Sequence, residues 1–562
     1  MKAIKITAFL LILTVLLPVV SCESLDTMNE DPNNPEKVAP NYILTYALVE
    51  MTKGYRSKGD DNIACLLQYM QRGTTYYVDR LNHYNWTAEG WSNWYEILRN
   101  VKLMHESALK DGNKMLEGMS LALQANVFGI ITDLWGDCPY SESLKANEGI
   151  FFPKYDAQID VYKGVLADLK SADQVFSASD IGEYNIGNAD VLYGGDAVKW
   201  KKFVNSLRLR YCMRLIEKRA EMSSAGVDIV AEFNDAAGKA FTSNSDDAFL
   251  PYLGTTKENS YPYGPINSVT AGILSHNTKP AKTIVDYLKA INDPRLYRLF
   301  KPVETKWDFD ISEETTKTFT NMFGDTYSVI WLPTTDHNLD TSLYVGLPIG
   351  MQGADAIRYN SAGMTFIGEE RSPFISNLHE RFFQNAGTYV RMDIFGYAEV
   401  EFLLAEAAER GGFAVTGAET HFSNAIKASM SRWGIQDGAN GFDFNAYYAN
   451  PDVSYAAAGN KIERIMQQKW IALWYMPEPW FDWRRTGYPD LRVGENTFYG
   501  VPFANTLPLR FQYPTPNQDP RYLINYNEAV GKLEKTSYVP ASQSADIHYS
   551  KMWLLQGTGK PY

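Results

Sequence analysis

Residues 461–489 read KIERIMQQKWIALWYMPEPWFDWRRTGYP. Apolar residues recur at three- and four-residue steps from Ile462 to Leu473, which is the spacing of a helix with one face in a core. The aromatic block from Trp480 to Arg485 follows directly. Asp482 and Arg485 have the i, i+3 spacing that allows pairing along a helical turn, and guanidinium planes stack well on tryptophan. We therefore interpret this block as a structural clasp and not as a ligand site.

Other stretches show the same helical spacing. They are Met119 to Leu134, Ile159 to Ala172, Val204 to Ile216 and Tyr397 to Ala408. By contrast, residues 241–278 and 302–392 are rich in Gly, Pro, Ser, Thr and Asn, which predicts long loops with a few short strands. Helices that follow one another without long strands favour stacked helix hairpins of the tetratricopeptide kind. The predicted fold class is therefore mainly α, a helical scaffold that carries long, loop-rich insertions.

The N-terminus has the pattern of an export signal. An apolar run from Ala8 to Val20 is too short to span a membrane but suits a secretory signal. The run ends in VVSC, which resembles a bacterial lipobox, so we predict a signal peptide over 1–21 and an acylated Cys22. The alternative is an ordinary signal with an incidental cysteine. Residues 22–38 then form a tether, and since no later stretch is apolar for about 18 residues, lipid alone is expected to anchor the chain.

The composition limits the classes of ligand and partner that the chain is expected to bind. The formal net charge of −13 disfavours nucleic acid, and the aromatic share of 14% is high for an exported protein. Cys65, Cys138 and Cys212 are widely spaced and form no CxxC motif, so neither a zinc site nor a dense disulfide framework is indicated. One disulfide between two of them stays open.

Catalytic patterns are incomplete. An HExxH motif that would begin at His105 has Leu109 in place of its second histidine. Glu399 and Glu406 share one face of a predicted helix, and since two carboxylates suffice for a glycosidase, that reading stays open. Their apolar neighbours favour buried acids bonded to arginines of a neighbouring helix. The sequence therefore predicts no enzyme, no cofactor and no metal site.

Blocks along the whole chain resemble the SusD/RagB family of outer-membrane nutrient-binding lipoproteins, in its SusD-like branch. In chain order they are 29–35 (NEDPNNP), 131–140 (ITDLWGDCPY), 292–295 (NDPR), 398–407 (AEVEFLLAEA), 467–473 (QQKWIAL), 480–489 (WFDWRRTGYP), 513–514 (YP) and 525–529 (NYNEA). Cys138 departs from the family pattern, in which valine is usual. Each block is modest alone, but their order is specific.

The resemblance implies a single SusD-like domain over 39–562, mainly α, in which a large irregular, loop-rich region is packed on a tetratricopeptide-like helix-pair scaffold. Its helical scaffold would lie mainly in 40–240 and 390–486, and its loop-rich, ligand-side insertions mainly in 241–390 and 487–562. The family implies a SusC-like, TonB-dependent transporter as partner, over which the lipoprotein sits as a lid on the outside of the outer membrane. The cargo is usually a glycan and in some members a peptide. A surface glycoside hydrolase is the third reading.

The segment from Tyr76 to Trp94 is the strongest binding candidate. Sugar rings stack their C–H faces on Trp or Tyr, and their hydroxyls need polar side chains at the edges. The expected ligand contacts of the segment are Tyr76, Tyr77, Asn82, Asn85 and Trp86. Trp94 and Tyr95 are assigned to the core, because a helix is predicted there. Trp307, Trp331 and Arg358, from the central insertion, are candidates for the opposite wall.

Overall fold

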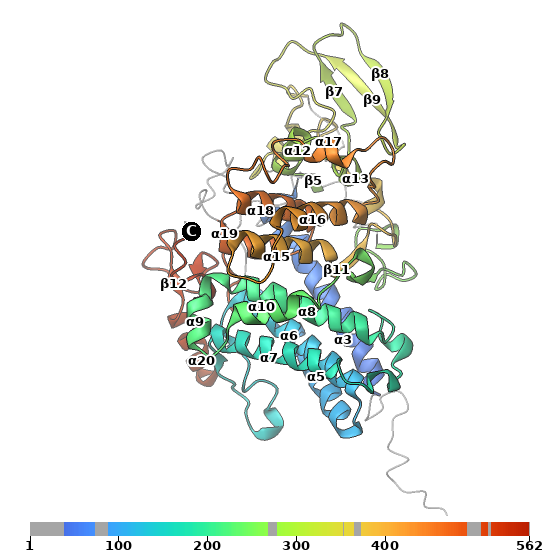
Figure 1. Cartoon of the computed structure of the whole chain (residues 1–562). Coiled ribbons are helices and arrows are strands. Elements are labelled where there is room, and N and C mark those ends of the chain that lie inside the picture. The colour runs from blue at the N-terminus through green and yellow to red at the C-terminus, as the bar shows by residue number, and fades with distance from the viewer. Residues whose placement is uncertain are drawn as a thin grey trace, which may run out of the picture.

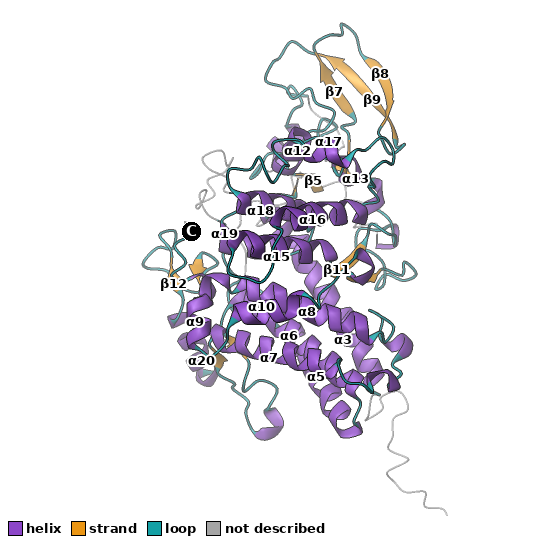
Figure 2. Ribbon diagram, in the orientation of Figure 1, coloured by secondary structure: helices purple, strands orange, loops and turns teal. Residues whose placement is uncertain are grey.

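Helices are the main regular structure of the protein. The computed structural model describes residues 39–72, 88–267, 278–351, 353–364, 372–491, 507–514 and 519–560. Figure 1 shows α5 to α8 lying together in the lower half of the view, with α15, α16 and α18 above them and a small sheet at the top. Figure 2 shows that strands are few and short. The predicted mainly α class is confirmed.

The first group of helices comes from the N-terminal part of the chain. It comprises α3 (Pro40–Lys58), α4 (Ala64–Leu66), α5 (Ser92–Asp111), α6 (Lys114–Trp135), α7 (Gln158–Val175), α8 (Ala197–Arg214), α9 (Arg219–Ser224) and α10 (Ile229–Ala237). The turn between α5 and α6 shows why these helices form hairpins. Gly112 takes a left-handed φ of 66° after α5, and the Asn113 side chain accepts a hydrogen bond from the Leu116 N–H at 3.1 Å. One helix thus ends and the next is capped within two residues.

The second group of helices comes from the later part of the chain. It comprises α12 (Lys282–Ala290), α13 (Leu296–Leu299), α14 (Gly353–Arg358), α15 (Tyr397–Arg410), α16 (Ala418–Arg432), α17 (Phe444–Tyr448), α18 (Lys461–Ala472), α19 (Glu478–Thr486) and α20 (Pro520–Gly531). The five stretches with helical spacing all form helices, namely α6, α7, α8, α15 and α18. The periodicity predicted them because each carries apolar residues at helical spacing, although α6, α8 and α15 are buried on nearly all sides.

Apart from one three-stranded sheet, the described strands form short two-stranded ladders. The pairs are β1 (Met70–Arg72) with β5 (Thr278–Pro280), β2 (Cys138–Pro139) with β3 (Tyr155–Asp156), β4 (Ala248–Pro251) with β11 (Arg391–Phe395), β6 (Phe300–Lys301) with β10 (Asn377–Leu378), and β12 (Glu534–Lys535) with β13 (Ser550–Lys551). One three-stranded sheet has the order β7 (Thr305–Asp308), β9 (Thr326–Pro333), β8 (Thr315–Thr320). Strand β9 runs parallel to β7 and antiparallel to β8.

Helix α6 lies at the centre of the first helical group and packs against both α5 and α7. It is long and apolar enough to cross a membrane by length and composition, yet 83% of its most apolar window is buried inside the protein. Contacts within the protein therefore account for its apolarity. The thiols of Cys65, Cys138 and Cys212 are also buried, and none is in a disulfide within the described part of the chain.

The block that begins at Trp480 forms α19 and closes the helical scaffold. Trp480 is fully buried, and its Nε1 donates to the carbonyl of Pro508 at 2.8 Å. Nη1 of Arg484 donates to the carbonyls of Asp133 and Leu509 at 2.8 and 2.9 Å. These contacts join α19, the end of α6 and the C-terminal region, so the predicted structural clasp is confirmed.

Candidate binding site

The segment with the strongest binding prediction lies largely outside the described residues. Tyr76, Tyr77, Asn82, Asn85 and Trp86 belong to residues 73–87, and their ligand contacts stay predictions. The same holds for Cys22 as lipid anchor. The structure does describe the two ends of the segment, Arg72 and Ala88, and the elements that hold them.

The first end of the segment is held by the β1–β5 ladder, where Arg72 pairs with Thr278. Gln68 turns the chain from α4 into β1 with a left-handed φ of 57°, and its Nε2 donates to the carbonyl of Leu491 at 2.5 Å. Arg72 and Thr278 therefore pair at the end of one short ladder, and Leu491 is bonded to Gln68, just before that ladder begins.

The second end of the segment is fixed in an aromatic cluster. The ring of Trp91 lies 5.3 to 5.9 Å, between centroids, from the rings of Tyr95, Trp135, Tyr155 and Tyr513. Trp94 is 4% exposed and belongs to the core, as predicted. The start of α5 is thus a rigid base for the residues that precede it.

A hollow of about 420 Å³ lies between α3 and α5, next to this second end. Such a volume falls within the range of small-molecule sites, roughly 300–1,000 Å³. The side chains that line it include Tyr46, Glu50, Lys53, Ser57, Lys58, Asn93, Trp94 and Glu96. The α3 residues recur at three- and four-residue steps, so they form one stripe along the helix.

The hollow combines an aromatic ring with paired charges. Tyr46 is 39% exposed, and burial together with the nearby Glu96 carboxylate raises the pKa of its hydroxyl. Lys53 pairs with Glu50 at 3.3 Å, and Lys58 pairs with Glu89. A ring face beside carboxylate acceptors and ammonium donors suits a ligand with C–H faces and hydroxyl edges.

Tyr46 was not among the predicted ligand contacts, although the sequence contains a signal for it. Tyr42 and Tyr46 have the i, i+4 spacing of one helix face, and both are exposed, Tyr42 at 74%. Two tyrosines on the polar face of an amphipathic helix are not needed for the core. For predicting a ligand contact, exposed tyrosines on the polar face are therefore more informative than aromatic residues on the apolar face.

Trp307 and Trp331 lie on the adjacent strands β7 and β9. Trp307 is 4% exposed, stacks on Phe374 at 4.7 Å between centroids, and donates through Nε1 to the carbonyl of Asn360 at 2.7 Å. In this conformation it offers no ring face to solvent, so a ligand contact would require its uncovering. Trp331 is half-buried, and the Nζ of Lys317 lies 3.6 Å from its ring centroid.

Arg358 is exposed at the end of α14, two residues before Asn360. Trp307 donates to the carbonyl of Asn360, so Arg358 lies in the same part of the protein as Trp307 and Trp331. The sequence alone did not show this. None of the three lines the hollow between α3 and α5. Their predicted ligand contacts remain predictions for a separate wall.

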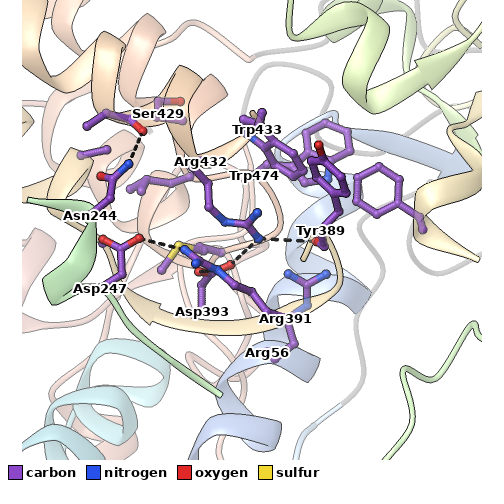
Figure 3. A pocket seen from close by; sticks show the side chains of 17 residues that line it. Arg56, Asn244, Asp247, Tyr389, Arg391, Asp393, Ser429, Arg432, Trp433 and Trp474 are labelled. Atoms are coloured by element: carbon purple, nitrogen blue, oxygen red, sulfur yellow. Dashed lines mark hydrogen bonds and ion pairs between the residues drawn. The ribbon is translucent and has the colours of Figure 1, made fainter. Parts of the chain in front are cut away.

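An arginine-rich cavity lies deeper, where α3, β11 and α16 meet (Figure 3). Its volume is about 40 Å³, which is room for water but not for a nutrient. Arg391 bonds Asp247 at 2.9 Å and Asp393 at 2.6 Å, and Arg432 reaches Asp393 at 3.3 Å. Burial alone would raise the pKa of Asp393, but these two guanidinium groups hold it below its ordinary value. We interpret the cavity as a structural junction.

The carboxylates that left a hydrolase reading open are bound to arginines. Glu399 is fully buried and accepts from Arg210 of α8 at 2.7 and 2.8 Å. Glu406 is fully buried and pairs with Arg485 of α19 and with Arg410. The interpretation of both as buried, arginine-bonded acids is confirmed. Within the described ranges, no group of three or more His, Cys, Asp or Glu is placed to hold a metal.

Comparison with known proteins agrees with this architecture. A SusD homolog of Bacteroides fragilis has a TM-score of 0.71 at 22% identity and covers 92% of this chain and 100% of its own. A Bacteroides vulgatus outer-membrane protein whose name connects it with nutrient binding has a TM-score of 0.68 at 25% identity over 92% and 100% of the chains. A chitin-binding protein has a TM-score of 0.66 at 24% identity over 92% and 99%.

No curated protein matches the chain significantly. The family model SusD-like, described as starch-binding and associating with the outer membrane, matches residues 32–313 and 305–514. These two matches span most of the chain and cover both helical groups except α20. The protein therefore belongs to the SusD/RagB family, in its SusD-like branch of nutrient-binding proteins associated with the outer membrane.

Proposed function

We propose that this protein captures a glycan at the cell exterior and delivers it to a SusC-like, TonB-dependent transporter, while a lipid on Cys22 holds it to the outer membrane. The match of both halves of the chain to the starch-binding, outer-membrane family carries the proposal. The similarity to a chitin-binding protein supports a glycan as cargo.

The geometry supports binding without turnover. The hollow beside Tyr46 has an aromatic face, and its Glu50 carboxylate is held by Lys53 at 3.3 Å. Glu399 and Glu406 are buried in ion pairs, so neither faces a substrate. Binding by stacking and hydrogen bonds needs no free carboxylate, and these three carboxylates are all held in ion pairs.

Binding and turnover can be measured on the same purified chain. Affinity electrophoresis and calorimetry against starch, chitin fragments and a peptide mixture are expected to show retention by one polysaccharide class, with the ligand recovered intact. Binding to peptides alone would change the cargo to peptide. Oligosaccharide hydrolysis that is lost with a single carboxylate substitution would replace the proposal with a surface glycoside hydrolase.

The proposed association with a transporter can be tested by purification from outer membranes. Outer membranes solubilised in mild detergent are expected to yield this protein together with a TonB-dependent transporter on affinity purification. A Cys22→Ala variant expressed at the same level is the matched control, because it lacks the proposed anchor. Recovery of the lipoprotein without any transporter would count against the delivery step.

A further inference from the structure

Six large apolar side chains are exposed on elements at one end of the helical scaffold. Figure 1 shows α5, α20 and the start of α3 at the lower end of the view, opposite the sheet of β7, β8 and β9. Large apolar side chains that are exposed together mark interaction surfaces. We call the six residues the lower apolar face. They are 40% to 74% exposed and comprise Tyr42 of α3, Leu103 and Leu109 of α5, Phe151 between β2 and β3, and Tyr522 and Ile524 of α20.

Helices α3 and α5 pack against each other in opposite directions. Lys58, at the end of α3, pairs with Glu89, just before α5, whereas Tyr46 lies beside Glu96 within α5. Tyr42 precedes Tyr46 by one turn and points to the same side of α3. The start of α3 therefore lies beside the second half of α5, which carries the two exposed leucines.

The loop between β2 and β3 is bonded to the same helix. The Tyr95 hydroxyl donates to the carbonyl of Pro139 at 2.6 Å, and Nζ of Lys102 donates to the carbonyl of Leu144 at 2.8 Å. The chain after β2 thus runs alongside α5 toward the C-terminal end of that helix. Phe151 lies further along this loop.

Helix α20 holds the loop from its other side. Nδ2 of Asn525 donates to the carbonyls of Phe152 and Pro153, each at 3.0 Å. The ring of Phe152 lies 4.7 Å from that of Tyr522, between centroids, and the guanidinium of Arg521 lies 4.2 Å from the Phe152 ring. The ring next to Phe151 is therefore fixed, while Phe151 itself is turned to solvent.

The position of the proposed lipid anchor indicates what covers this face. The described chain begins at Ala39, three residues before Tyr42. Cys22 precedes Ala39 by 17 residues, a length that spans at most about 60 Å when extended. The membrane that holds the lipid is therefore within reach of the face. Along the chain, Tyr42 is also the nearest exposed apolar residue to the anchor.

The charges near the face are paired. Arg99 lies 3.8 Å from Glu96, and Arg521 pairs with Asp519 at 2.6 Å. The two arginine side chains are 65% and 66% exposed. Long basic side chains keep their charge in water while their stems cover apolar groups, as at membrane interfaces. The apolar side chains therefore distinguish this face, and a lipid surface suits them.

We propose that the lower apolar face rests on the lipid surface to which Cys22 is anchored, with Leu103, Leu109 and Phe151 among the lipid headgroups. The inference rests on the lipid anchor of the proposed function. The lipid supplies the attachment, since even one whole acyl chain binds a membrane only marginally. The face sets the orientation, and it directs the sheet of β7, β8 and β9 away from the membrane.

Fluorescence quenching by lipid tests the contact directly. Cysteines introduced at the surface can be labelled selectively, because Cys65, Cys138 and Cys212 are buried. The fluorophore NBD is attached to Leu109→Cys or, as the matched control, to Ile330→Cys on β9, which is 40% exposed. The acylated protein is reconstituted into vesicles of phosphatidylethanolamine and phosphatidylglycerol that contain spin-labelled phosphatidylcholine.

The label at Leu109→Cys is expected to lose about half of its fluorescence or more, because interfacial apolar groups lie roughly 5–10 Å into the boundary between headgroups and acyl chains. The label at Ile330→Cys should keep its fluorescence. Adding Leu103→Ser and Phe151→Ser to the Leu109→Cys chain should reduce the quenching at least about twofold, since less apolar area is then buried. Leu253→Ser, at a 67% exposed residue after β4, is the control for these changes and should leave the quenching as it is.

The outcomes separate the contact from the anchor. If the acylated protein floats with the vesicles and both labels stay unquenched, the lipid contact is overturned and the proposed function stands. Shielding of the label at Leu109→Cys only after a TonB-dependent transporter is reconstituted with the protein would also overturn it and assign the face to the transporter. A chain that carries no lipid on Cys22 and does not float would refute the anchor and, with it, this inference.

Discussion

Arg485 on α19 donates to the carboxylate of Glu406 on α15 through both terminal nitrogens, and the bond from Nη2 to Oε2 measures 2.5 Å. Both residues are buried, and Nη2 of Arg485 also reaches Asp482 at 2.7 Å. Lys469 of α18 completes the group by pairing with Asp482 at 2.8 Å. Three helices of the second group are therefore joined by one buried ionic network.

Removal of one member of this network should destabilise the fold strongly. Arg485→Met leaves the Glu406 carboxylate buried with only Arg410, and breaking a buried pair costs about 3–5 kcal/mol. Urea unfolding measures the change in the free energy of unfolding. Lys163→Met, which removes the exposed pair with Asp160 on α7, is the control and should cost less than about 0.5 kcal/mol. Equal stability of the two variants would contradict the network's importance.

His548 should make stability fall in mildly acidic solution. Burial and the nearby Arg510 lower the pKa of this 4% exposed side chain from 6.5 to about 4. The unfolded chain therefore binds a proton below pH 6.5 that the folded chain refuses until about pH 4. Stability is lost as pH falls through this window, by about 3 kcal/mol in total.

The His548 effect can be isolated by comparing pH profiles. His548→Gln should flatten the dependence of the unfolding free energy on pH between 6.5 and 4, relative to the wild type. His337→Gln is the control, because His337 is exposed to solvent. Profiles of identical slope for the wild type and His548→Gln would contradict the assignment.

Truncation of Trp86 should lower the affinity for glycan, whereas truncation of Trp91 should lower the stability of the fold. Trp86→Ala is expected to weaken glycan binding at least tenfold, a change of about 1.4 kcal/mol, with an unchanged melting temperature. Trp91→Ala should lower the melting temperature by several degrees, because its ring contacts Trp135, Tyr155 and Tyr513. If Trp86→Ala instead loses stability and keeps its affinity, Trp86 packs between the first helix pairs.

Tyr46 tests whether the hollow between α3 and α5 belongs to the binding site. Tyr46→Ala removes a stacking face and should weaken glycan binding by about three- to tenfold, since such a contact contributes on the order of 1 kcal/mol. Leu103→Ala is the control, because Leu103 is 51% exposed on α5 outside the hollow. Wild-type affinity in Tyr46→Ala would exclude the hollow from the site.

Cys22 should be the sole attachment to the membrane. Cys22→Ala is expected to release soluble protein or to leave an unprocessed precursor, because several acyl chains are needed for stable anchoring. Palmitate labelling and membrane fractionation measure the effect, and protease treatment of intact cells reports exposure on the outside. Unchanged fractionation with an unlabelled Cys22 would refute the anchor.

The helical scaffold was predictable because its signals are local. The spacing from Ile462 to Leu473 predicts α18 correctly, since a helix places residues three and four apart on one face. The clasp from Trp480 was predictable for the same reason, because the block follows a core helix and Asp482 and Arg485 have the i, i+3 spacing of one helical turn. The sheet formed by β7, β8 and β9 was expected only as a few short strands, since strands of this length carry a weak pattern.

The sequence by itself determined the helices, the family and the segment where aromatic and amide side chains alternate. Only the tertiary structure decided which aromatic rings are covered. Trp307 lies in a loop-rich insertion, yet Phe374 covers its face, and Tyr46 lies on a scaffold helix, yet it borders a hollow. Whether a ring is exposed depends on residues far away in the chain. The strand pairing of Arg72 with Thr278 likewise joins residues far apart in the sequence. Periodicity reports only neighbours within a few residues, so it carries no information about such contacts.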